Sequence, residues 1–221
     1  MMNNKLKKYE TIACCGIDCG LCPRFYTKGS SVCPGCGGLD FKEVHPSCGV
    51  LTCCAVKKGF EVCSECSDYP CKRFSSYSAG CDSFVTHKKM FENLEYIKNN
   101  GIEQFLENQK ERMNILSDFL SNFDDGRSKS FYCLSCTLLP LDKLMKASEF
   151  AQKIDNIELK KKNKRLKEHL TKIADELNIE MKLNKRKVND KAESLNVNSV
   201  GQRPTERNEH EKPEAPKGRN Q

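Results

Sequence analysis

Apolar side chains recur at helical intervals through the middle of the chain, from residue 83 to about residue 183. The first apolar run begins at Phe84 and ends before Gly101, because glycine accepts the left-handed conformation that closes a helix. A second run ends before the turn that starts at Asp124. Residues 83–183 are therefore predicted to be mainly helical.

A third predicted helix begins after Pro140, which suits the first turn of a helix, and continues to about Leu183. Its second half carries a short heptad stripe, with one polar member among apolar residues at alternating steps of four and three. The stripe comprises Leu159, Asn163, Leu166, Leu170, Ile173 and Leu177. Such a stripe is typical of an amphipathic helix that lies on its own domain, or of a coiled-coil contact with another chain. We expect a protein partner to bind around residues 159–177.

The segment Phe131–Leu139, before this third helix, is apolar and is predicted to be a short strand or a buried loop. It contains Cys133 and Cys136. Their apolar neighbours indicate buried free cysteines, with a further pair of metal ligands or a redox dithiol as alternatives.

Residues 11–82 combine most of the cysteines with glycine, proline and short apolar pieces, and they show no sustained period. The scattered apolar side chains there could build only a small core, and a segment of about 70 residues with so little apolar surface to bury needs an additional cross-link. Bound metal supplies one, because a structural zinc site contributes roughly 10 to 16 kcal/mol of apparent binding energy. The predicted fold is mainly α, with an irregular, metal-organised cysteine-rich N-terminal domain. A small α+β arrangement is the alternative.

The charge balance is a weak guide to partners. The 37 Lys and Arg residues exceed the 30 Asp and Glu residues, giving a net charge of +7, but a metal ion bound by four thiolates would add about two negative charges. Six basic residues between Lys160 and Lys167 could contact phosphate, yet acidic residues flank them and no aromatic residue is interleaved for base stacking. Nucleic acid is therefore only a second class of expected partner. No stretch approaches the ~20 apolar residues that cross a bilayer, so we expect a cytoplasmic protein without membrane contact.

The chain has 15 cysteines, which indicate metal or redox chemistry because disulfides are rare in a reducing compartment. Four pairs have the Cys-x-x-Cys form, in which two intervening residues let both sulfurs face one ion about 2.3 Å away. In the pair Cys33 and Cys36, Pro34 presets the turn and Gly37 permits a positive φ after the second ligand. The cysteines of the first third that stand at ligand spacings are Cys15, Cys19, Cys22, Cys33, Cys36, Cys48, Cys54, Cys63, Cys66 and Cys71.

These candidates exceed the eight ligands of two zinc sites with four thiolates each. The surplus leaves three alternatives open. The metals could be bridged, a third site could include His45 or His87, or some of the thiols could bind no metal. Zinc is the expected metal and an iron–sulfur cluster is the alternative, because thiolate-only ligation suits both. The spacing of Cys15, Cys19 and Cys22 also matches the cluster motif of radical S-adenosylmethionine enzymes, but the chain lacks the alternating strands and helices of their barrel.

Catalytic motifs are scarce. No phosphate-binding glycine loop and no nucleophile elbow occurs in the sequence. A closed set of thiolates would leave no open position on the metal for a substrate. The sequence therefore leaves open whether the chain is an enzyme, and the balance is against it.

Four ordered motifs carry a family resemblance: CGIDCGLCP at 15–23, CPGC at 33–36, CAVKKG at 54–59 and CSECSDYPC at 63–71. Together they resemble the prokaryotic domain of unknown function 3795 family, over roughly residues 11–80. The resemblance implies a small cysteine-rich domain that binds zinc or another metal, with no established reaction. By its spacing to Lys58 and Gly59, Cys54 rather than Cys53 occupies the family position.

The chain is thus predicted to have four parts. Residues 1–10 form a flexible N-terminus, 11–82 a cysteine-rich metal-binding domain, 83–183 a helical region with a long basic C-terminal helix, and 184–221 a disordered polar tail. The expected function is that of a binding or scaffolding module with structural zinc. The alternative is an iron–sulfur redox protein, or an accessory protein of an anaerobic enzyme system.

Overall fold

The computed structural model describes residues 5–74 and 82–185, and its regular structure is helical. Within these ranges the only β-pairing is an isolated antiparallel bridge between Ile12 and Asp18. The prediction of a mainly helical chain with an irregular N-terminal segment is confirmed, and these ranges contain no strand of an α+β arrangement. None of the helices in this part of the chain has the length and apolar character needed to cross a bilayer.

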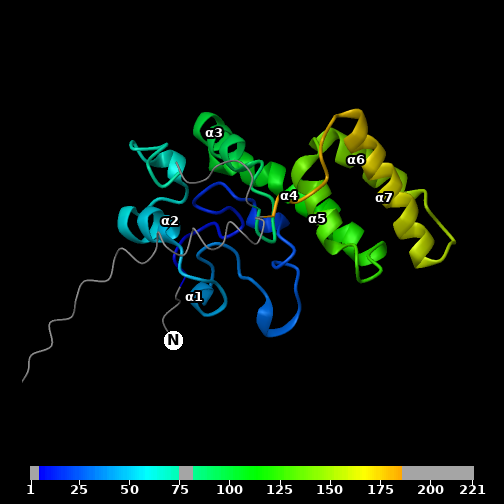
Figure 1. The fold of residues 1–221 in the computed structure, drawn as a ribbon, viewed down its shortest axis with the longest axis horizontal. Helices are drawn as coiled ribbons and strands as arrows, with labels where there is room; N and C mark the ends of the chain where they lie inside the picture. The colour runs from blue at the N-terminus through cyan, green and yellow to red at the C-terminus, as the bar shows by residue number, and fades with distance from the viewer. Residues whose placement is uncertain (1–4, 75–81, 186–221) are drawn as a thin grey trace, which may run out of the picture. The chain divides into compact units, whose positions relative to one another are not determined.

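Short helical turns joined by loops make up the cysteine-rich segment, which runs from blue to cyan in Figure 1. The turns are η1 (Cys19–Leu21), η2 (Gly29–Ser31), α1 (Phe41–Val44), α2 (Gly49–Leu51), η3 (Thr52–Lys57) and η4 (Cys63–Glu65). Gly35 has a φ of 84°, and a Cβ atom there would lie 2.4 Å from the carbonyl oxygen of Glu10. Glycine is therefore required where this loop passes the N-terminal residues.

Five longer helices follow. They are α3 (Met90–Asn100), α4 (Ile102–Asn122), α5 (Lys129–Leu138), α6 (Leu141–Gln152) and α7 (Leu159–Glu176). Gly101 separates α3 from α4 with a φ of 87°, and its N–H group donates to the carbonyl oxygen of Ile97 (2.8 Å). The predicted helix stop at Gly101 is confirmed, and α4 ends just before the predicted turn at Asp124.

Two predictions for the helical region are wrong. Residues 131–139, expected to be a strand or a buried loop, lie mostly in α5, where every side chain from Tyr132 to Leu138 is buried. A helix buried on all sides shows no amphipathic period, so its apolar run resembles that of a strand. The single helix expected from Leu141 to about Leu183 is in fact α6 and α7, because the chain turns between them at Asn156, which has a φ of 51°.

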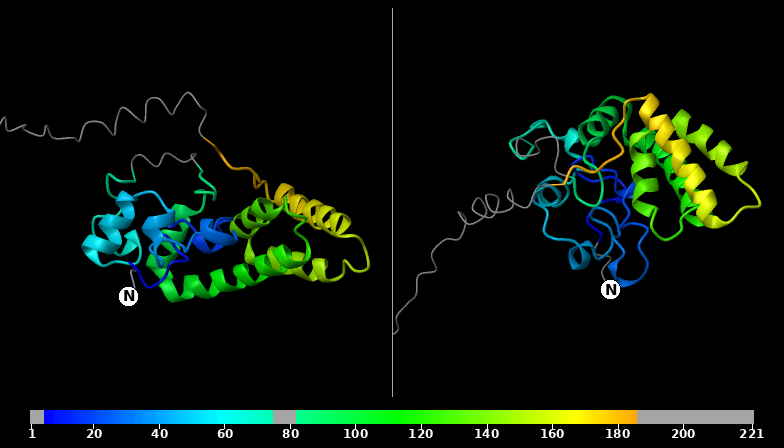
Figure 2. Two further views of the ribbon diagram at one scale, coloured as in Figure 1. Left: turned by 90° about the horizontal axis from the view of Figure 1, so that it is seen from below. Right: turned by 45° about the vertical axis from the view of Figure 1, so that its right-hand side comes forward.

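The buried apolar side chains form two clusters. The first cluster belongs to the cysteine-rich segment and includes Leu94 and Ile97 of α3. The second cluster is built by α4–α7 and includes Leu21 of η1. Helix α4 contacts α3, η1, α5 and α6, and it runs from the cysteine-rich segment to the later helices (Figure 2). Because the first cluster continues past residue 82, the proposed boundary between 11–82 and 83–183 stays a prediction.

Residues 5–10, expected to belong to a flexible N-terminus, pack against the cysteine-rich segment. The side chain of Lys7 is 1% exposed. Its Nζ donates hydrogen bonds to the carbonyl oxygens of Ile12 (2.6 Å) and Glu61 (2.7 Å). The N–H group of Leu6 bonds to the carbonyl oxygen of Gly37 (2.7 Å). This stretch therefore joins segments that are far apart in the sequence.

The described chain ends beside residue 82. The N–H group of Asp82 donates to the carbonyl oxygen of Asn184 (2.7 Å), and the N–H group of Asn184 donates to the carboxylate of Asp82 (2.9 Å). The predicted disordered tail, 184–221, lies outside the described residues from position 186 onward, as do residues 1–4 of the predicted flexible N-terminus.

The heptad stripe of α7 packs against the second apolar cluster. Leu166 and Leu170 are fully buried, whereas Leu159 and Leu177 at its ends are 44% and 37% exposed. The polar member, Asn163, is also buried and bonds to α5 and the residue before it: it accepts from the Tyr132 hydroxyl (2.9 Å) and donates to Ser128 Oγ (2.8 Å). The centre of the stripe is thus covered by the protein itself, and the expected protein contact around 159–177 stays a prediction for the exposed face.

Replacing Asn163 with alanine should lower the free energy of unfolding by about 2 kcal/mol, because it leaves the buried Tyr132 hydroxyl without its acceptor. Urea denaturation measures this loss. Lys161→Ala, at an exposed position of the same helix, is the matched control and should change stability by no more than about 0.5 kcal/mol. Equal losses in the two variants would contradict the role of the Asn163 hydrogen bonds.

Candidate functional site

Backbone hydrogen bonds bring distant parts of the cysteine-rich segment together. The N–H group of Cys63 donates to the carbonyl oxygen of Cys14 (2.8 Å). The N–H group of Cys36 donates to the carbonyl oxygen of Glu10 (2.8 Å). Cys14 and its neighbours in sequence are thereby contacted by two segments that each carry a cysteine.

Cys14, Cys36, Cys54 and Cys63 form what we call the inner thiol group. The sulfur of Cys14 interacts with the thiols of Cys36 and Cys54, and the thiol of Cys54 interacts with Cys63. The exposed fractions of Cys14, Cys36 and Cys54 are 1%, 8% and 3%, and Cys63 is half-buried. All four belong to, or pack against, the first apolar cluster, although they come from four separate segments of the chain.

Hydrogen bonding between these thiols separates their acidities. Interaction with the thiols of Cys36 and Cys54 lowers the pKa of Cys14 and raises the pKa of Cys36 and Cys54. Interaction with Cys54 likewise lowers the pKa of Cys63, while the Cys54 thiol itself donates to the carbonyl oxygen of Phe60 (3.5 Å). The nearby positive charge of Lys7 lowers the pKa of Cys14 further. Within the inner thiol group, Cys14 and Cys63 therefore favour thiolate, the form of cysteine that binds metal, whereas Cys36 and Cys54 favour the protonated thiol.

Sequence reasoning missed Cys14, because the spacing to Cys19 and Cys22 selects its neighbour Cys15. In the structure Cys15 is also buried, and burial raises its pKa to about 12. It lies near Cys48 as well as the inner thiol group. The sequence did contain a signal for Cys14. The motif spacing uses only one cysteine of the doublet Cys14 and Cys15, so the other is left without an assigned role.

A second thiol group lies around η1 and consists of Cys15, Cys19, Cys22 and Cys33. Burial, followed by the proximity of the other three thiols, raises the pKa of Cys19. The N–H group of Cys22 bonds to the carbonyl oxygen of Cys19 (3.1 Å), which closes the turn between them. Cys33 is a neighbour of both Cys19 and Cys22. The pair Cys33 and Cys36 is thus divided between the two groups.

The other predicted ligands, Cys48, Cys66 and Cys71, are half-buried, as is Cys53. Cys53, Cys66 and Cys71 line a pocket of about 200 Å³ together with Cys54 and Cys63 of the inner thiol group. The sequence assigned Cys54 rather than Cys53 to the family position, and Cys54 is the more buried of the two.

Within residues 5–74 and 82–185, no set of three or more Cys, His, Asp or Glu side chains is arranged so that it could hold a metal ion. The inner thiols interact pairwise, as protonated thiols do, because each S–H group is a hydrogen-bond donor. Their type, burial and proximity suit a thiophilic ion, but the ten predicted ligands do not meet at one point. They divide among the inner thiol group, the second thiol group and the surface pocket, so their role as ligands stays a prediction.

Other candidates from the sequence lie elsewhere. His45 is exposed and stacks on Phe41, with 4.4 Å between ring centroids. His87 Nε2 lies 3.3 Å from the hydroxyl of Ser83. Cys133 and Cys136 are buried and unbridged in α5, as predicted, and burial raises the pKa of Cys136 to about 12.

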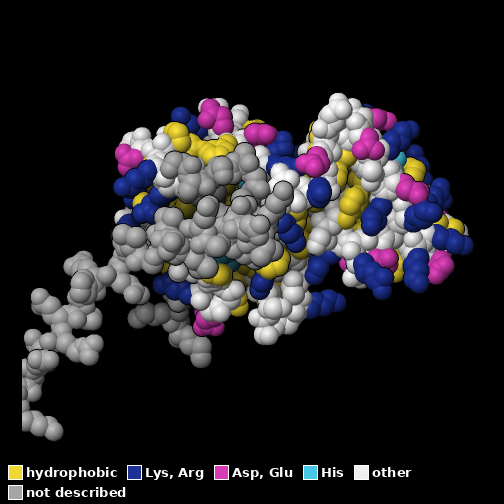
Figure 3. Space-filling view, in the orientation of Figure 1, with side chains coloured by type: hydrophobic (Ala, Val, Ile, Leu, Met, Phe, Trp, Pro, Cys, Tyr) yellow, Lys and Arg dark blue, Asp and Glu magenta, His cyan; other side chains and the backbone are white. Residues whose placement is uncertain are grey.

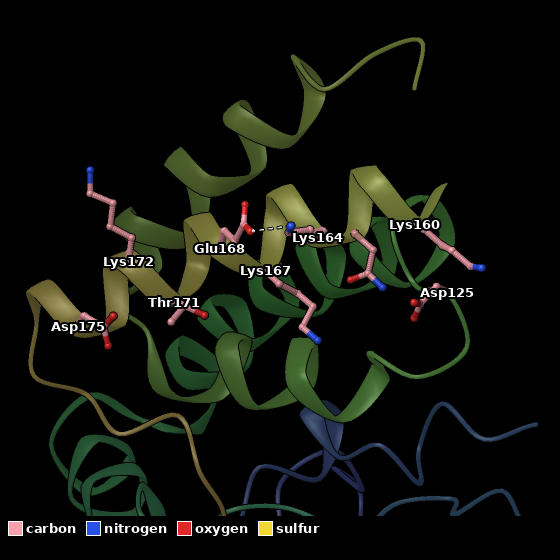
Figure 4. A pocket seen from close by; sticks show the side chains of 9 residues that line it. Asp125, Lys160, Lys164, Lys167, Glu168, Thr171, Lys172 and Asp175 are labelled. Atoms are coloured by element: carbon pink, nitrogen blue, oxygen red, sulfur yellow. Dashed lines mark ion pairs between the residues drawn. The ribbon is translucent and has the colours of Figure 1, made fainter. Parts of the chain in front are cut away.

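The basic stretch of α7 lines a shallow cleft of about 520 Å³ (Figure 4). Its charged lining residues are Lys160, Lys164, Lys167, Lys172, Asp125, Glu168 and Asp175. Lys164 pairs with Glu168 at 3.8 Å, and Lys167 Nζ lies 5.2 Å from the centre of the Phe131 ring. Figure 3 shows basic and acidic side chains interspersed over α6 and α7. This mixture weakens the local positive potential, so the cleft is a poorer candidate for a phosphate site than the thiol groups are for a metal.

A buried carboxylate connects the first cysteine motif to α4. Asp18 Oδ1 accepts hydrogen bonds from Gln109 Nε2 (2.7 Å) and from the N–H group of Leu21 (3.2 Å). Burial raises the pKa of Asp18 to about 6, although the hydrogen bond from Gln109 and the charge of Arg112 oppose the shift. Gln109 also donates to the carbonyl oxygen of Thr11 (2.9 Å), so one buried amide fixes both ends of the loop that precedes η1.

Comparison with known families identifies the cysteine-rich segment. Residues 11–76 match the family model described as "Protein of unknown function (DUF3795)". The match confirms the family resemblance that the four motifs predict, and it spans the inner and second thiol groups and the cysteines of the surface pocket. The searches against curated proteins and against solved structures returned no match.

Replacing Asp18 with asparagine should make stability less dependent on pH. Because the folded pKa of about 6 exceeds the ordinary aspartate value of 3.8, wild-type stability is lost as pH rises between these values. The loss from this group is about 3 kcal/mol, and the amide, which keeps an acceptor for Gln109, does not undergo it.

Urea denaturation of both proteins at pH 4 and pH 7 measures the effect. The stability of Asp18→Asn relative to the wild type should increase from the lower to the higher pH. Parallel pH profiles would contradict the raised pKa.

Proposed function

We propose, from the assignment of residues 11–76 to the DUF3795 family, that this domain holds structural zinc through cysteine thiolates and acts as a binding module. The observation that supports the proposal is the series of pairwise contacts that links four thiols from four chain segments in the inner thiol group. Disulfides would not explain this arrangement, because the four thiols are unbridged.

Cys14, Cys36, Cys54 and Cys63 would hold the ion. Binding of the ion would require the S–H protons of these thiols to be released, so that four thiolates could share the charge of the metal. A zinc ion supplies no redox chemistry here, and a closed shell of four sulfurs leaves no site for substrate. Its contribution is to join segments that have little apolar surface in common.

The second thiol group is a candidate for another ion. Cys15, Cys19, Cys22 and Cys33 supply four sulfurs, and burial of Cys15 and Cys19 keeps them from solvent. Arg24 is the positive side chain that acts on this group, through Cys22.

The partner of a binding module would contact surface that the fold leaves open. The buried centre of the α7 stripe is unsuitable, whereas the exposed lysines on the other face, Lys160, Lys164 and Lys172, are accessible. This face of α7 is therefore the proposed protein contact.

Substitution within the doublet Cys53 and Cys54 tests the proposed ligand set. Cys54→Ser should remove about one zinc ion per chain, because a serine hydroxyl is a poor ligand for zinc. Cys53→Ser changes the adjacent residue, which lies outside the inner thiol group, and should retain that ion. Elemental analysis of anaerobically purified full-length protein gives the zinc content. Equal zinc content in the two variants would contradict the ligand set.

Removal of zinc by a chelator should unfold the cysteine-rich segment and leave the second apolar cluster folded. Hydrogen exchange followed by mass spectrometry can resolve the two regions, with loss of protection expected in residues 11–74 and retained protection in α5–α7. Metal-free protein with unchanged protection and unchanged thermal stability would overturn the proposal. Absorbance near ~400 nm with acid-labile sulfide would instead assign the thiols to an iron–sulfur cluster.

A further inference from the structure

The surface pocket of about 200 Å³ contains sulfur atoms of two kinds. Cys54 and Cys63 belong to the inner thiol group, whereas Cys53, Cys66 and Cys71 are half-buried and belong to neither group. The pocket therefore reaches from solvent to two of the four proposed zinc ligands. The second thiol group is not part of its lining.

Charged side chains hold one surface thiol in place at this pocket. Lys58 Nζ lies 2.9 Å from the sulfur of Cys66 and 2.7 Å from a carboxylate oxygen of Asp68. Arg73 is also on the lining. Val50 and Phe74 are buried and form apolar walls.

A zinc ion in a closed shell of four thiolates leaves slowly by simple dissociation, because the first Zn–S bond must break before another forms. Exchange is faster when an additional thiolate adds first, since zinc accepts a fifth ligand in a transition state. Each step then forms one Zn–S bond and breaks another. The incoming thiol gives up its proton and the released thiolate takes one up, so no oxidant or reductant is needed.

We propose that this pocket is an exchange port, at which Cys53, Cys66 and Cys71 act as transient ligands that pass zinc between the inner thiol group and thiol-containing carriers in solution. The inference rests on the proposed zinc binding and extends that proposal from a permanently bound structural ion to an ion that can be loaded and withdrawn. Lys58 and Arg73 would favour carriers in which zinc is bound by small anionic thiols. The cysteines at the port are thus positioning and relay groups, and the inner four are the resting ligands.

The rate of zinc transfer to a chromophoric chelator tests the port. Full-length wild-type protein is compared with the triple variant Cys53→Ser, Cys66→Ser and Cys71→Ser. Cys133→Ala is the control, because it removes a thiol of the second apolar cluster that does not line the pocket. The triple variant should contain as much tightly bound zinc as the wild type but release it about tenfold more slowly. Cys133→Ala should match the wild type in both measurements.

Lys58→Met provides a second variant that keeps every thiol. It removes the hydrogen bond to Cys66 and should slow transfer without changing zinc content. Supplying zinc as a complex with glutathione, an anionic thiol, should load the metal-free wild type faster than it loads this variant.

The outcomes separate the two proposals. Wild-type protein without zinc would overturn both of them. A zinc-containing triple variant that releases the ion at the wild-type rate would overturn the port alone. Loss of a whole equivalent of zinc from the triple variant would also overturn it, because the surface thiols would then be resting ligands.

Discussion

The buried ammonium group of Lys7 restricts how the cysteine-rich segment can fold. Its Nζ donates to the carbonyl oxygens of Ile12 and Glu61, and its side chain is almost inaccessible to water. A buried charge that lost these acceptors would cost several kcal/mol, so residues 7, 12 and 61 must stay together. Since Cys14 and Cys63 lie two residues beyond Ile12 and Glu61, the same interaction brings these two cysteines together, and a backbone hydrogen bond joins them.

This constraint matters because the segment has little else to bury. Its helical turns are short, and its apolar cluster is completed by Leu94 and Ile97 from α3. A small core provides limited stability, so polar groups that are fully paired have a disproportionate share in defining the fold. Gln109 has the same role on the other side of the segment, where it joins Asp18 and Thr11 to α4. Bound metal would add to an arrangement that hydrogen bonds already define.

Sequence patterns predicted the helices that have one exposed face and a marked end. The stop at Gly101 and the end of α4 near Asp124 follow from local chemistry, because a positive φ and an Asx turn depend on the residues present. Helix α5 was missed because burial on every side removes the periodic signal. The turn at Asn156 was missed because asparagine tolerates a positive φ without requiring it, and neither glycine nor proline marks the position.

The family and the set of cysteines could also be found from the sequence, but the partition of the thiols could not. Sequence spacing shows only that two cysteines lie close together within one turn. The assignment of Cys36 to one thiol group and of Cys33 to the other depends on the path of the chain over residues 5–15. The missed residue, Cys14, makes the same point. Cys14 and Cys15 are the central residues of a turn that the hydrogen bond from the Gly16 N–H group to the carbonyl oxygen of Ala13 (2.8 Å) closes, and both are buried. Which thiols each of them contacts is set by segments that are distant in sequence.

Environment, rather than residue type, separates the cysteines into chemical classes. Cys136 is buried among apolar side chains of α5, so the thiol form is favoured and its reactivity is low. Cys14 is equally buried, but two thiols and an ammonium group act on its sulfur, which reverses the direction of its pKa shift. Cys66 is accessible and bonded to Lys58. Cys54 and Cys63, which belong to the inner thiol group with Cys14, line the same pocket as Cys66, so the second and third environments adjoin at one surface.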